Sequence, residues 1–162
     1  MEKSNIILRK PRKEDGKKIH KLVESTKVLD VNSEYLYLLQ STHFQDLCSV
    51  ATYEDKVIGF VSGYMIPNEA DTLFIWQVAV DDNFRGNDLA RRLIMEIINR
   101  EELGINYLHT TVSPSNNASI RVFEKVAKHF DTKMESFEFF VAEDFEHQHE
   151  EEVLYKIGPF KK

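Results

Sequence analysis

The segment Trp76–Ala90 carries the residue pattern with the clearest chemical meaning in this chain. A β-rich stretch, Thr72–Val80, leads into a polar turn with Arg85 and Gly86, and a helix begins near Leu89. Such a turn leaves backbone N–H groups pointing outward at the helix start, where they and the helix dipole attract an anion. Glycine lets a phosphate approach the backbone, and arginine adds positive charge. The spacing alone fits an ordinary strand-to-helix turn equally well.

Hydrophobic periodicity predicts the elements that position this turn. About seven strands and about four helices follow in an order that mixes hairpins with helical crossovers, which is typical of an α/β fold with a mixed sheet. Glu54-Asp55-Lys56 forms a hairpin turn, and Asn32 or Ser33 caps the second helix. The expected strands are Ile6–Arg9, Leu47–Tyr53, Val57–Tyr64, Thr72–Val80, Tyr107–Val112, Lys133–Phe140 and Val153–Ile157, and the expected helices are Lys13–Ser25, one around Tyr35–Leu39, Leu89–Ile98 and Asn116–Lys128.

Composition narrows the class of protein. The chain has 162 residues, of which 42% are hydrophobic and 30% charged, so we expect one globular domain over residues 1–162. No apolar run predicts a membrane span, the N-terminus lacks a secretory signal, and Cys48 has no cysteine partner, so we expect a cytoplasmic protein. The net charge of −6 argues against nucleic acid and favours a small cationic substrate, although an acidic surface also keeps proteins soluble.

The turn resembles the acetyl-CoA motif of the GCN5-related N-acetyltransferases. In that superfamily the motif is Arg or Gln, two residues, Gly, one residue, and Gly or Ala. Arg85 and Ala90 match it, whereas Asp88 replaces the usual glycine; we expect its side chain to face solvent and to favour the helix N-terminus. The resemblance implies a sheet with splayed middle strands and acetyl-CoA as co-substrate, without a metal. It assigns cofactor binding to Val78, Ala79, Val80, Arg85, Gly86, Asn87, Asp88, Leu89 and Ala90.

A second part of the superfamily pattern lies in the late helix. Asn116, Ser119, Val122 and Phe123 match its asparagine, small, aliphatic and aromatic positions. The resemblance implies that Asn116, Ser119 and Phe123 bind the cofactor, the first two at the pantetheine arm. The aromatic position often holds a tyrosine that reprotonates the leaving thiolate, and Phe123 lacks that hydroxyl. Asn116 is also suited to cap the helix, and both roles are compatible.

Further segments resemble the L-2,4-diaminobutyrate acetyltransferases of ectoine biosynthesis over nearly the whole chain. This resemblance implies transfer of acetyl to the 4-amino nitrogen of diaminobutyrate, ring closure by a separate synthase, and a role in osmotic stress. Superfamily relatives are often dimers, so we expect a homodimer. The segments are Arg9–Gly16, Val28–Phe44, Asp71–Asp81, Thr111–Ser119 and His149–Phe160.

Direct attack by an amine on a thioester sets the requirements for the remaining residues. A primary alkylamine has a pKa of about 10.4, so neutralising it at pH 7 costs roughly 4–5 kcal/mol. Glu152 and His149 are candidates for the catalytic site, because Glu152 could accept a proton through water or bind the α-ammonium. His149 and Glu152 could also suggest a metal pair, but no second cluster supports one. A backbone N–H near Val78 or Ala79 is suited to the oxyanion.

The residues that we expect to bind the substrate lie mainly in the loop before the second helix and in the strand Thr72–Val80. Asp30 and Asn32 lie on an irregular loop, where Asp30 could pair with an ammonium or be an exposed loop acid. Tyr35 could hydrogen-bond from the first helical turn. Trp76 could pack in the core, and we favour a position at the substrate and the chemistry. Thr111 is also expected beside the substrate, and Arg121, His109 and His43 are unranked candidates for its carboxylate.

Two other classes remain open. A non-catalytic acyl-CoA-binding or sensor module on the same scaffold is favoured by Phe123 and Asp88, the two departures from the superfamily pattern. A protein acetyltransferase requires an open peptide groove, which the sequence neither shows nor excludes.

Overall fold

The structure is a computed structural model that describes residues 5–162 and divides the chain into two compact units. Unit 1 comprises residues up to Tyr64 together with Trp76–Glu101, and unit 2 comprises Met65–Ile75 and Glu102–Lys162. Within residues 5–162, no helix has the length and apolar character needed to cross a membrane. The predicted single domain stays a prediction.

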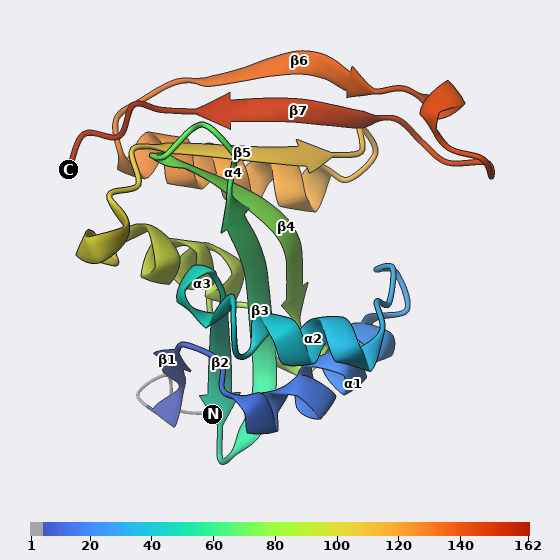
Figure 1. Ribbon diagram of the computed structural model, residues 1–162, viewed down its shortest axis with the longest axis vertical. Coiled ribbons are helices and arrows are strands. Elements are labelled where there is room, and N and C mark those ends of the chain that lie inside the picture. Colours follow the sequence, from blue (N-terminus) through green and yellow to red (C-terminus); the bar gives the residue numbers. More distant parts are fainter. Residues whose placement is uncertain (1–4) are drawn as a thin grey trace. The chain divides into compact units, whose positions relative to one another are not determined.

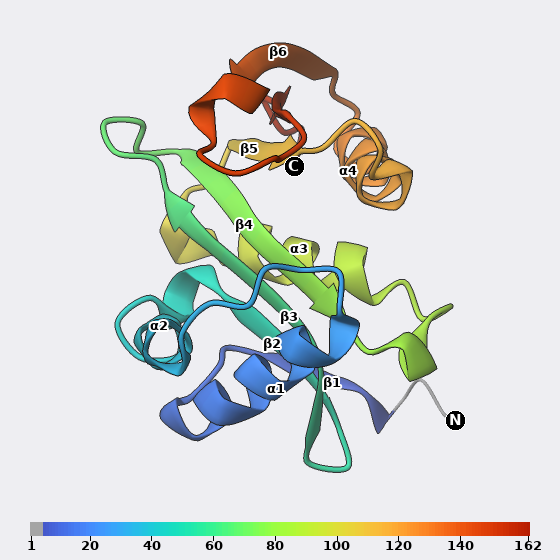
Figure 2. The ribbon, with the colours of Figure 1, turned by 90° about the vertical axis from the view of Figure 1, so that its right-hand side faces the viewer.

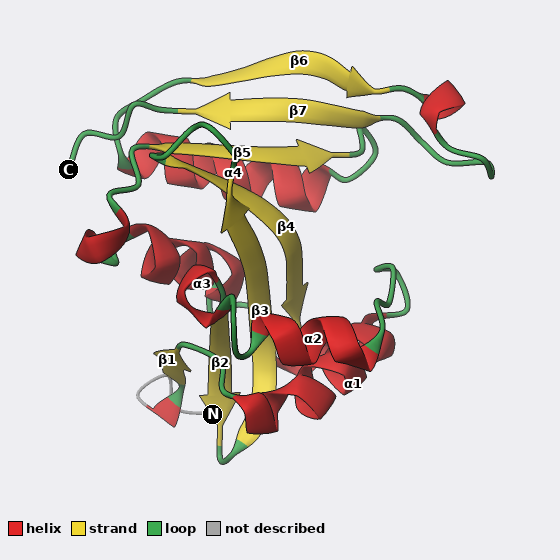
Figure 3. Cartoon of the chain, viewed as in Figure 1, coloured by secondary structure: helices red, strands yellow, loops and turns green. Residues whose placement is uncertain are grey.

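The predicted elements are all present, and Figure 3 distinguishes the helices from the strands. Hydrogen-bonded neighbours give a seven-stranded sheet in the order β1-β2-β3-β4-β5-β7-β6. The mixed α/β sheet with four α-helices is therefore confirmed, and the splay of the middle strands stays a prediction. The strands are β1 (Ile7–Arg9), β2 (Ser49–Tyr53), β3 (Lys56–Met65), β4 (Thr72–Val80), β5 (Tyr107–Val112), β6 (Met134–Phe140) and β7 (Glu152–Ile157), and the helices are α1 (Gly16–Thr26), α2 (Glu34–Gln40), α3 (Leu89–Ile98) and α4 (Asn117–His129).

Unit 1 packs helices on both faces of an antiparallel ribbon formed by β1, β2 and β3 (Figure 1 and Figure 2). On one face, Ile19 of α1 and Tyr37 of α2 join Phe60 of β3 in one buried cluster. The neighbouring residue Gly59 points to the other face, because strand side chains alternate. A Cβ on Gly59 would lie 2.8 Å from a terminal methyl of Leu93 of α3, so a side chain at this position would displace the Leu93 side chain.

Local signals in unit 1 explain where its elements begin and turn. Ser33 caps α2, and its side chain accepts from the backbone N–H of Leu36 at 3.2 Å, so the predicted cap is confirmed. Glu54 and Asp55 both have positive φ angles, 49° and 64°, which is the geometry of a type I′ hairpin turn. The helix predicted from Lys13 starts later, because Lys13–Asp15 form a 3₁₀ turn before α1.

Unit 2 is built on the antiparallel strands β5, β7 and β6 (Figure 1). The first half of β4, Thr72–Ile75, pairs in parallel with Tyr107–Thr110 of β5. Helix α4 buries Phe123, and the residue that follows the helix, Phe130, stacks on Phe160 with ring centroids 4.3 Å apart. The stacking ties the residue after α4 to the end of the chain.

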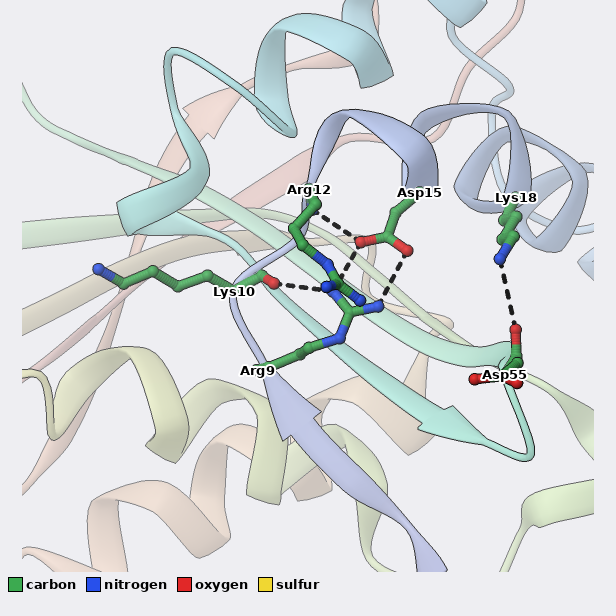
Figure 4. Close-up of polar contacts among 6 residues, drawn as sticks. All are labelled: Arg9, Lys10, Arg12, Asp15, Lys18 and Asp55. Carbon is green, nitrogen blue, oxygen red and sulfur yellow. Dashed lines mark hydrogen bonds and ion pairs between the residues drawn. The ribbon is translucent and has the colours of Figure 1, made fainter.

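An ion pair between the half-buried Arg9 and the buried Asp15 joins the end of β1 to the turn that starts α1 (Figure 4). The guanidinium of Arg9 donates to both carboxylate oxygens of Asp15, at 2.7 and 3.0 Å, and the backbone N–H of Arg12 donates to the same carboxylate at 2.7 Å. Burial opposes the charged form of Asp15, but the hydrogen bonds from Arg9 and Arg12 outweigh it and hold the pKa of Asp15 below its ordinary value.

We expect Asp15→Asn to lower the free energy of unfolding by about 2–3 kcal/mol at pH 7, because it leaves the Arg9 guanidinium without its counter-charge. Since the folded-state pKa of Asp15 is depressed, its contribution is present above the unfolded pKa of about 3.9 and is lost as pH falls through the folded value. Chemical denaturation at several pH values measures this difference. Asp46→Asn is the control, because the Lys10–Asp46 pair is exposed and should contribute under 1 kcal/mol. Equal losses for the two variants would contradict the expectation.

Candidate functional site

The turn between β4 and α3 is anchored to the neighbouring hairpin of unit 1. The backbone N–H of Asp81 donates to the carbonyl of Ile58 at 2.8 Å, and the Asp81 carboxylate lies 3.2 Å from the ammonium of Lys56. Phe84 is buried and packs on Tyr53, with ring centroids 5.4 Å apart. The turn is therefore held in place by contacts on its inner side, which leaves its outer side free for a ligand.

The backbone of this turn presents a row of unpaired donors. Gly86 has a φ of +87°, and no heavy atom lies within 4 Å of the position that its Cβ would take. Asp88 adopts left-handed angles (φ 56°, ψ 33°) at the helix N-cap, and its side chain is exposed, as expected from the sequence. Within the described residues, no group of the chain accepts a hydrogen bond from the backbone N–H groups of residues 86–91. This arrangement is suited to an anion such as a pyrophosphate.

The positive charges of the turn are balanced within the turn itself. The guanidinium of Arg85 pairs with Asp82 at 2.8 Å, and that of Arg91 pairs with Asp88 at 2.7 Å. The off-pattern Asp88 thus supplies the anion that a cation at a helix N-terminus requires. Both pairs are on the surface, so an incoming phosphate can compete for the arginines at little energetic cost.

The second half of β4 alternates between exposed and buried side chains. Trp76 is 49% exposed and meets the ring of Tyr64 edge-on at 6.5 Å, so it is not a core residue. Gln77 and Ala79 are buried, whereas Val78 and Val80 are half-buried. Of the three residues of this strand assigned to cofactor binding, Val78 and Val80 therefore offer side-chain surface, and Ala79 offers only its backbone.

The loop that precedes α2 holds the candidate substrate residues of unit 1. The side chains of Asp30 and Tyr35 are exposed, and that of Asn32 is half-buried. The loop is tied to buried side chains: the carbonyl of Asp30 accepts from Gln77 at 2.8 Å, and the backbone N–H of Asn32 donates to the hydroxyl of Tyr37 at 3.3 Å. Sequence reasoning missed these two anchors, because a tyrosine in a helix and a glutamine in a strand are common and do not indicate which backbone group they will bind.

In unit 2, Glu152 is held by two hydroxyl groups. Thr111 donates to one carboxylate oxygen at 3.0 Å, and Ser113 donates to the other at 2.5 Å. Glu152 opens β7, as predicted from the sequence. The structure therefore brings together two of the predicted site residues, Thr111 and Glu152, and adds Ser113, which sequence reasoning missed.

A second glutamate fixes the adjoining turn. Glu150 accepts from the backbone N–H of Ser115 at 2.9 Å and from its hydroxyl at 2.6 Å. The hydrogen bonds from the side chain and backbone of Ser115 hold the pKa of Glu150 below its ordinary value. His149 stacks on Phe145, with ring centroids 4.0 Å apart, and its Nδ1 contacts the carbonyl of Glu150. Among residues 5–162, no cluster of three or more histidine, cysteine, aspartate or glutamate side chains is arranged to hold a metal ion.

The start of α4 is capped as expected. The side chain of Asn116 accepts from the backbone N–H of Ser119 at 3.2 Å, which confirms the capping role. Ser119 is half-buried and remains available on the helix surface, whereas Phe123 is buried in the core of unit 2. Their assignments to the cofactor stay predictions, and Phe123 has no exposed ring face in this structure with which to make extensive contact.

The candidates for a carboxylate partner are dispersed. His109 is buried on β5 beside a hollow of about 510 Å³, and burial, with the nearby charge of Lys156, lowers its pKa. It is therefore mostly neutral at pH 7 and a weak partner for an anion. Arg121 on α4 and His43 after α2 are both exposed.

Comparison with known proteins shows the family. The model of the acetyltransferase (GNAT) family matches residues 17–127, which include the turn and the start of α4. The chain belongs to this family. Its GNAT fold is shared by solved structures of low identity, such as Ard1 from Thermoplasma volcanium, with a TM-score of 0.73, 16% identity, and coverage of 94% of this chain and 96% of that one.

Relatives of higher sequence identity are named as diaminobutyrate acetyltransferases. The L-2,4-diaminobutyric acid acetyltransferase of Halomonas elongata is 44% identical over 99% of this chain and 84% of its own, and that of Methylotuvimicrobium alcaliphilum is 45% identical over 96% and 92%. The solved diaminobutyrate acetyltransferase of Paenibacillus lautus, in complex with L-2,4-diaminobutyric acid and coenzyme A, has a TM-score of 0.91 and 36% identity over 96% of this chain and 95% of that one.

Proposed function

We propose that this protein transfers the acetyl group of acetyl-CoA to the 4-amino nitrogen of L-2,4-diaminobutyrate. The observation that carries the proposal is the 44% identity to an acetyltransferase named for this substrate, which extends over 99% of the chain. The similarity to a relative solved with diaminobutyric acid and coenzyme A supports both the substrate and the co-substrate.

Acetyl-CoA binding is assigned first to the turn of unit 1. Its pyrophosphate accepts from the free backbone N–H groups of residues 86–91, where the dipole of α3 adds to the attraction. Gly86 permits the close approach, since no side chain occupies its outer face. The backbone of Val78–Val80 binds the thioester arm, and an N–H near Val78 or Ala79 stabilises the oxyanion. Asn116 and Ser119 of unit 2 are assigned to the pantetheine.

The reaction forms a C–N bond and breaks a C–S bond. The neutral 4-amine attacks the thioester carbonyl, the oxyanion collapses, and the thiolate of coenzyme A leaves and takes up a proton. The proton lost by the amine goes to Glu152, directly or through water. Each oxygen of Glu152 already accepts one hydroxyl hydrogen bond and retains a lone pair for this purpose. Phe123 has no hydroxyl and cannot donate the proton to the thiolate, so the proton comes from another group or from water.

Acidic and aromatic residues of unit 1 bind the cationic substrate. Asp30 carries an exposed carboxylate that can pair with an ammonium group, and Asn32 and Tyr35 offer hydrogen bonds from the same segment. Trp76 presents half of its surface to stack on the aliphatic chain of the substrate or to exclude water. The net charge of −6 favours the approach of a dication. His149 is the remaining residue that we assign, with Glu152, to the substrate site.

The protein is proposed to act in the cytoplasm, in ectoine biosynthesis under osmotic stress, as a homodimer. Support for self-association comes from β6, which ends the strand order and therefore has an unpaired edge within the described part of the chain. Three phenylalanines of this strand, Phe137, Phe139 and Phe140, are 43–47% exposed. An exposed apolar edge strand is a common site of association, and a second copy of the chain offers the same strand for symmetric pairing.

We expect the purified protein to release coenzyme A with diaminobutyrate and to show at least about a hundredfold lower kcat/KM with ornithine or lysine, because longer chains misplace the reacting nitrogen. Mass spectrometry should locate the acetyl group on the 4-amino nitrogen. Equal rates on all three amines would remove the substrate assignment and leave the acetyltransferase class intact. Binding of acetyl-CoA without turnover of any amine would instead indicate an acyl-CoA sensor module.

We expect Glu152→Gln to lower kcat about a hundredfold while the KM for acetyl-CoA stays within twofold, because the amide keeps the shape of the carboxylate but cannot take a proton. Steady-state kinetics over pH 6–10 measure this effect. Glu151→Gln is the matched control on an exposed neighbour. A rise in the KM for diaminobutyrate with an unchanged kcat would assign Glu152 to the α-ammonium instead.

We expect light scattering after size-exclusion chromatography to give twice the chain mass of 19.0 kDa. Phe139→Ser should shift the protein to the monomer, because it removes apolar area at the proposed interface. Phe44→Ser, at a similarly exposed phenylalanine of unit 1, should leave the dimer intact. A wild-type monomer at micromolar concentration would refute the dimer.

A further inference from the structure

Two buried side chains hold the loop that carries Asp30 and Asn32. Tyr37 of α2 is fully buried, and its hydroxyl donates to the Oε1 of Gln77 at 2.9 Å. The Nε2 of Gln77 donates to the carbonyl of Asp30 at 2.8 Å, and the backbone N–H of Asn32 donates to the Tyr37 hydroxyl at 3.3 Å. The bonds form one continuous chain from Asn32 through Tyr37 and Gln77 back to Asp30.

The chain of hydrogen bonds determines the orientation of each group in it. The Gln77 amide can satisfy the Asp30 carbonyl only with its nitrogen on that side, which places its oxygen toward Tyr37. The Tyr37 ring is held edge-on by His20 and Phe60, with centroid distances of 6.0 and 5.9 Å. Because the phenol ring is fixed, its hydroxyl stays in place to bond Gln77 and the Asn32 amide. These bonds hold the backbone around Val31, although it belongs to no helix or sheet.

Packing alone would not hold this loop. Val28 is 87% exposed and Val31 is 44% exposed, and only Leu29 packs partly against the core cluster. The backbone between Leu29 and Ser33 therefore depends on hydrogen bonds for its position. Gln77 directly follows Trp76 in β4, so the same bonds fix the distance between the Asp30 loop and the backbone that carries the tryptophan.

We propose that Tyr37 and Gln77 are positioning residues for the amine substrate: they orient Asp30 and Asn32 without contacting the substrate themselves. This inference rests on the proposed function, because it presumes that the loop binds diaminobutyrate. It assigns a role to two residues that stand outside the acetyl-CoA motif. Acetyl-CoA binding is not expected to depend on them, since the hydrogen bonds of the two side chains run to each other and to the Asp30 loop, not to the turn of residues 81–90.

The test compares Tyr37→Phe and Gln77→Met, which remove the polar groups and nearly keep the volume. Each should raise the KM for diaminobutyrate about three- to tenfold, the effect of one or two lost hydrogen bonds. The KM for acetyl-CoA and kcat should stay within twofold. Because the two residues act through one chain of bonds, their effects should not add. The KM for diaminobutyrate of the double variant should be about that of the more strongly affected single variant. Tyr107→Phe, which removes a hydroxyl in unit 2, is the control and should leave all constants unchanged.

Hydrogen exchange of the unliganded protein provides a readout that is independent of turnover. The amide of Asn32 should exchange at least about tenfold faster in Tyr37→Phe than in the wild type, while the amides of α1 keep their protection. Faster exchange with an unchanged KM for diaminobutyrate, or a fall in thermal stability with no change in either KM, would reduce the pair to a structural role and overturn the proposal. If the wild type does not acetylate diaminobutyrate, the proposed function fails, while the exchange rates still report whether the bonds position the loop.

Discussion

The backbone N–H groups at the start of α3 impose the constraint on which the rest of the site depends. A helix cannot pair its own first donors, and here Gly86 and Asp88 extend the unpaired row into the preceding turn by adopting positive φ angles. Leaving these donors exposed is stable only because water or an anion can satisfy them. The neighbouring structure serves to hold the row still: Asp81 ties it to β3, and Phe84 anchors it on Tyr53.

Hydrogen bonds from side chains, rather than packing, fix the irregular segments of both units. In unit 1, Tyr37 and Gln77 hold the loop of Asp30. In unit 2, Glu150 and Glu152 hold the turn after β5. A loop held in this way can keep its outer surface polar and open to a ligand, because no apolar side chain has to be buried for stability. The ion pair of Arg9 with the buried Asp15 plays the same part at the start of α1.

The parts of the fold that depend on local pattern could be predicted from the sequence. β4 and α3 have the predicted bounds, and Ser33, Asn116 and the left-handed Asp88 behave as their residue types suggest. These features depend on periodicity and on capping, which act within a few residues. The start of α1 differed because the Arg9–Asp15 pair, which the pattern does not encode, sets the geometry of the turn before it.

The parts of the candidate site that depend on distant contacts could not be predicted in this way. Tyr37 and Gln77 are 40 residues apart, and a buried glutamine in a strand gives no sign of which carbonyl it will meet. Ser113 and Ser115 lie in a segment whose sequence is typical of a turn. Serine is common in turns because its hydroxyl bonds the nearby backbone, so its presence does not indicate a distant glutamate partner. The exposure of Trp76 does not follow from its residue type, since a lone tryptophan in a strand is usually buried; only its nearness to the turn favours a position outside the core.

The register between β5 and β7 fixes the hydrogen bonds of Glu150 and Glu152 at the same time. Glu150 and Glu152 are two residues apart, and they hold Ser115 and Ser113, which are also two residues apart. Asn116, the N-cap of α4, follows immediately. A slip of one residue between β5 and β7 would turn every side chain of β7 to the opposite face. Such a slip would remove the hydroxyl partners of Glu152 and release the turn that leads to the α4 cap at the same time. The orientation of the proposed base and the start of α4 are therefore set by the pairing of a single strand.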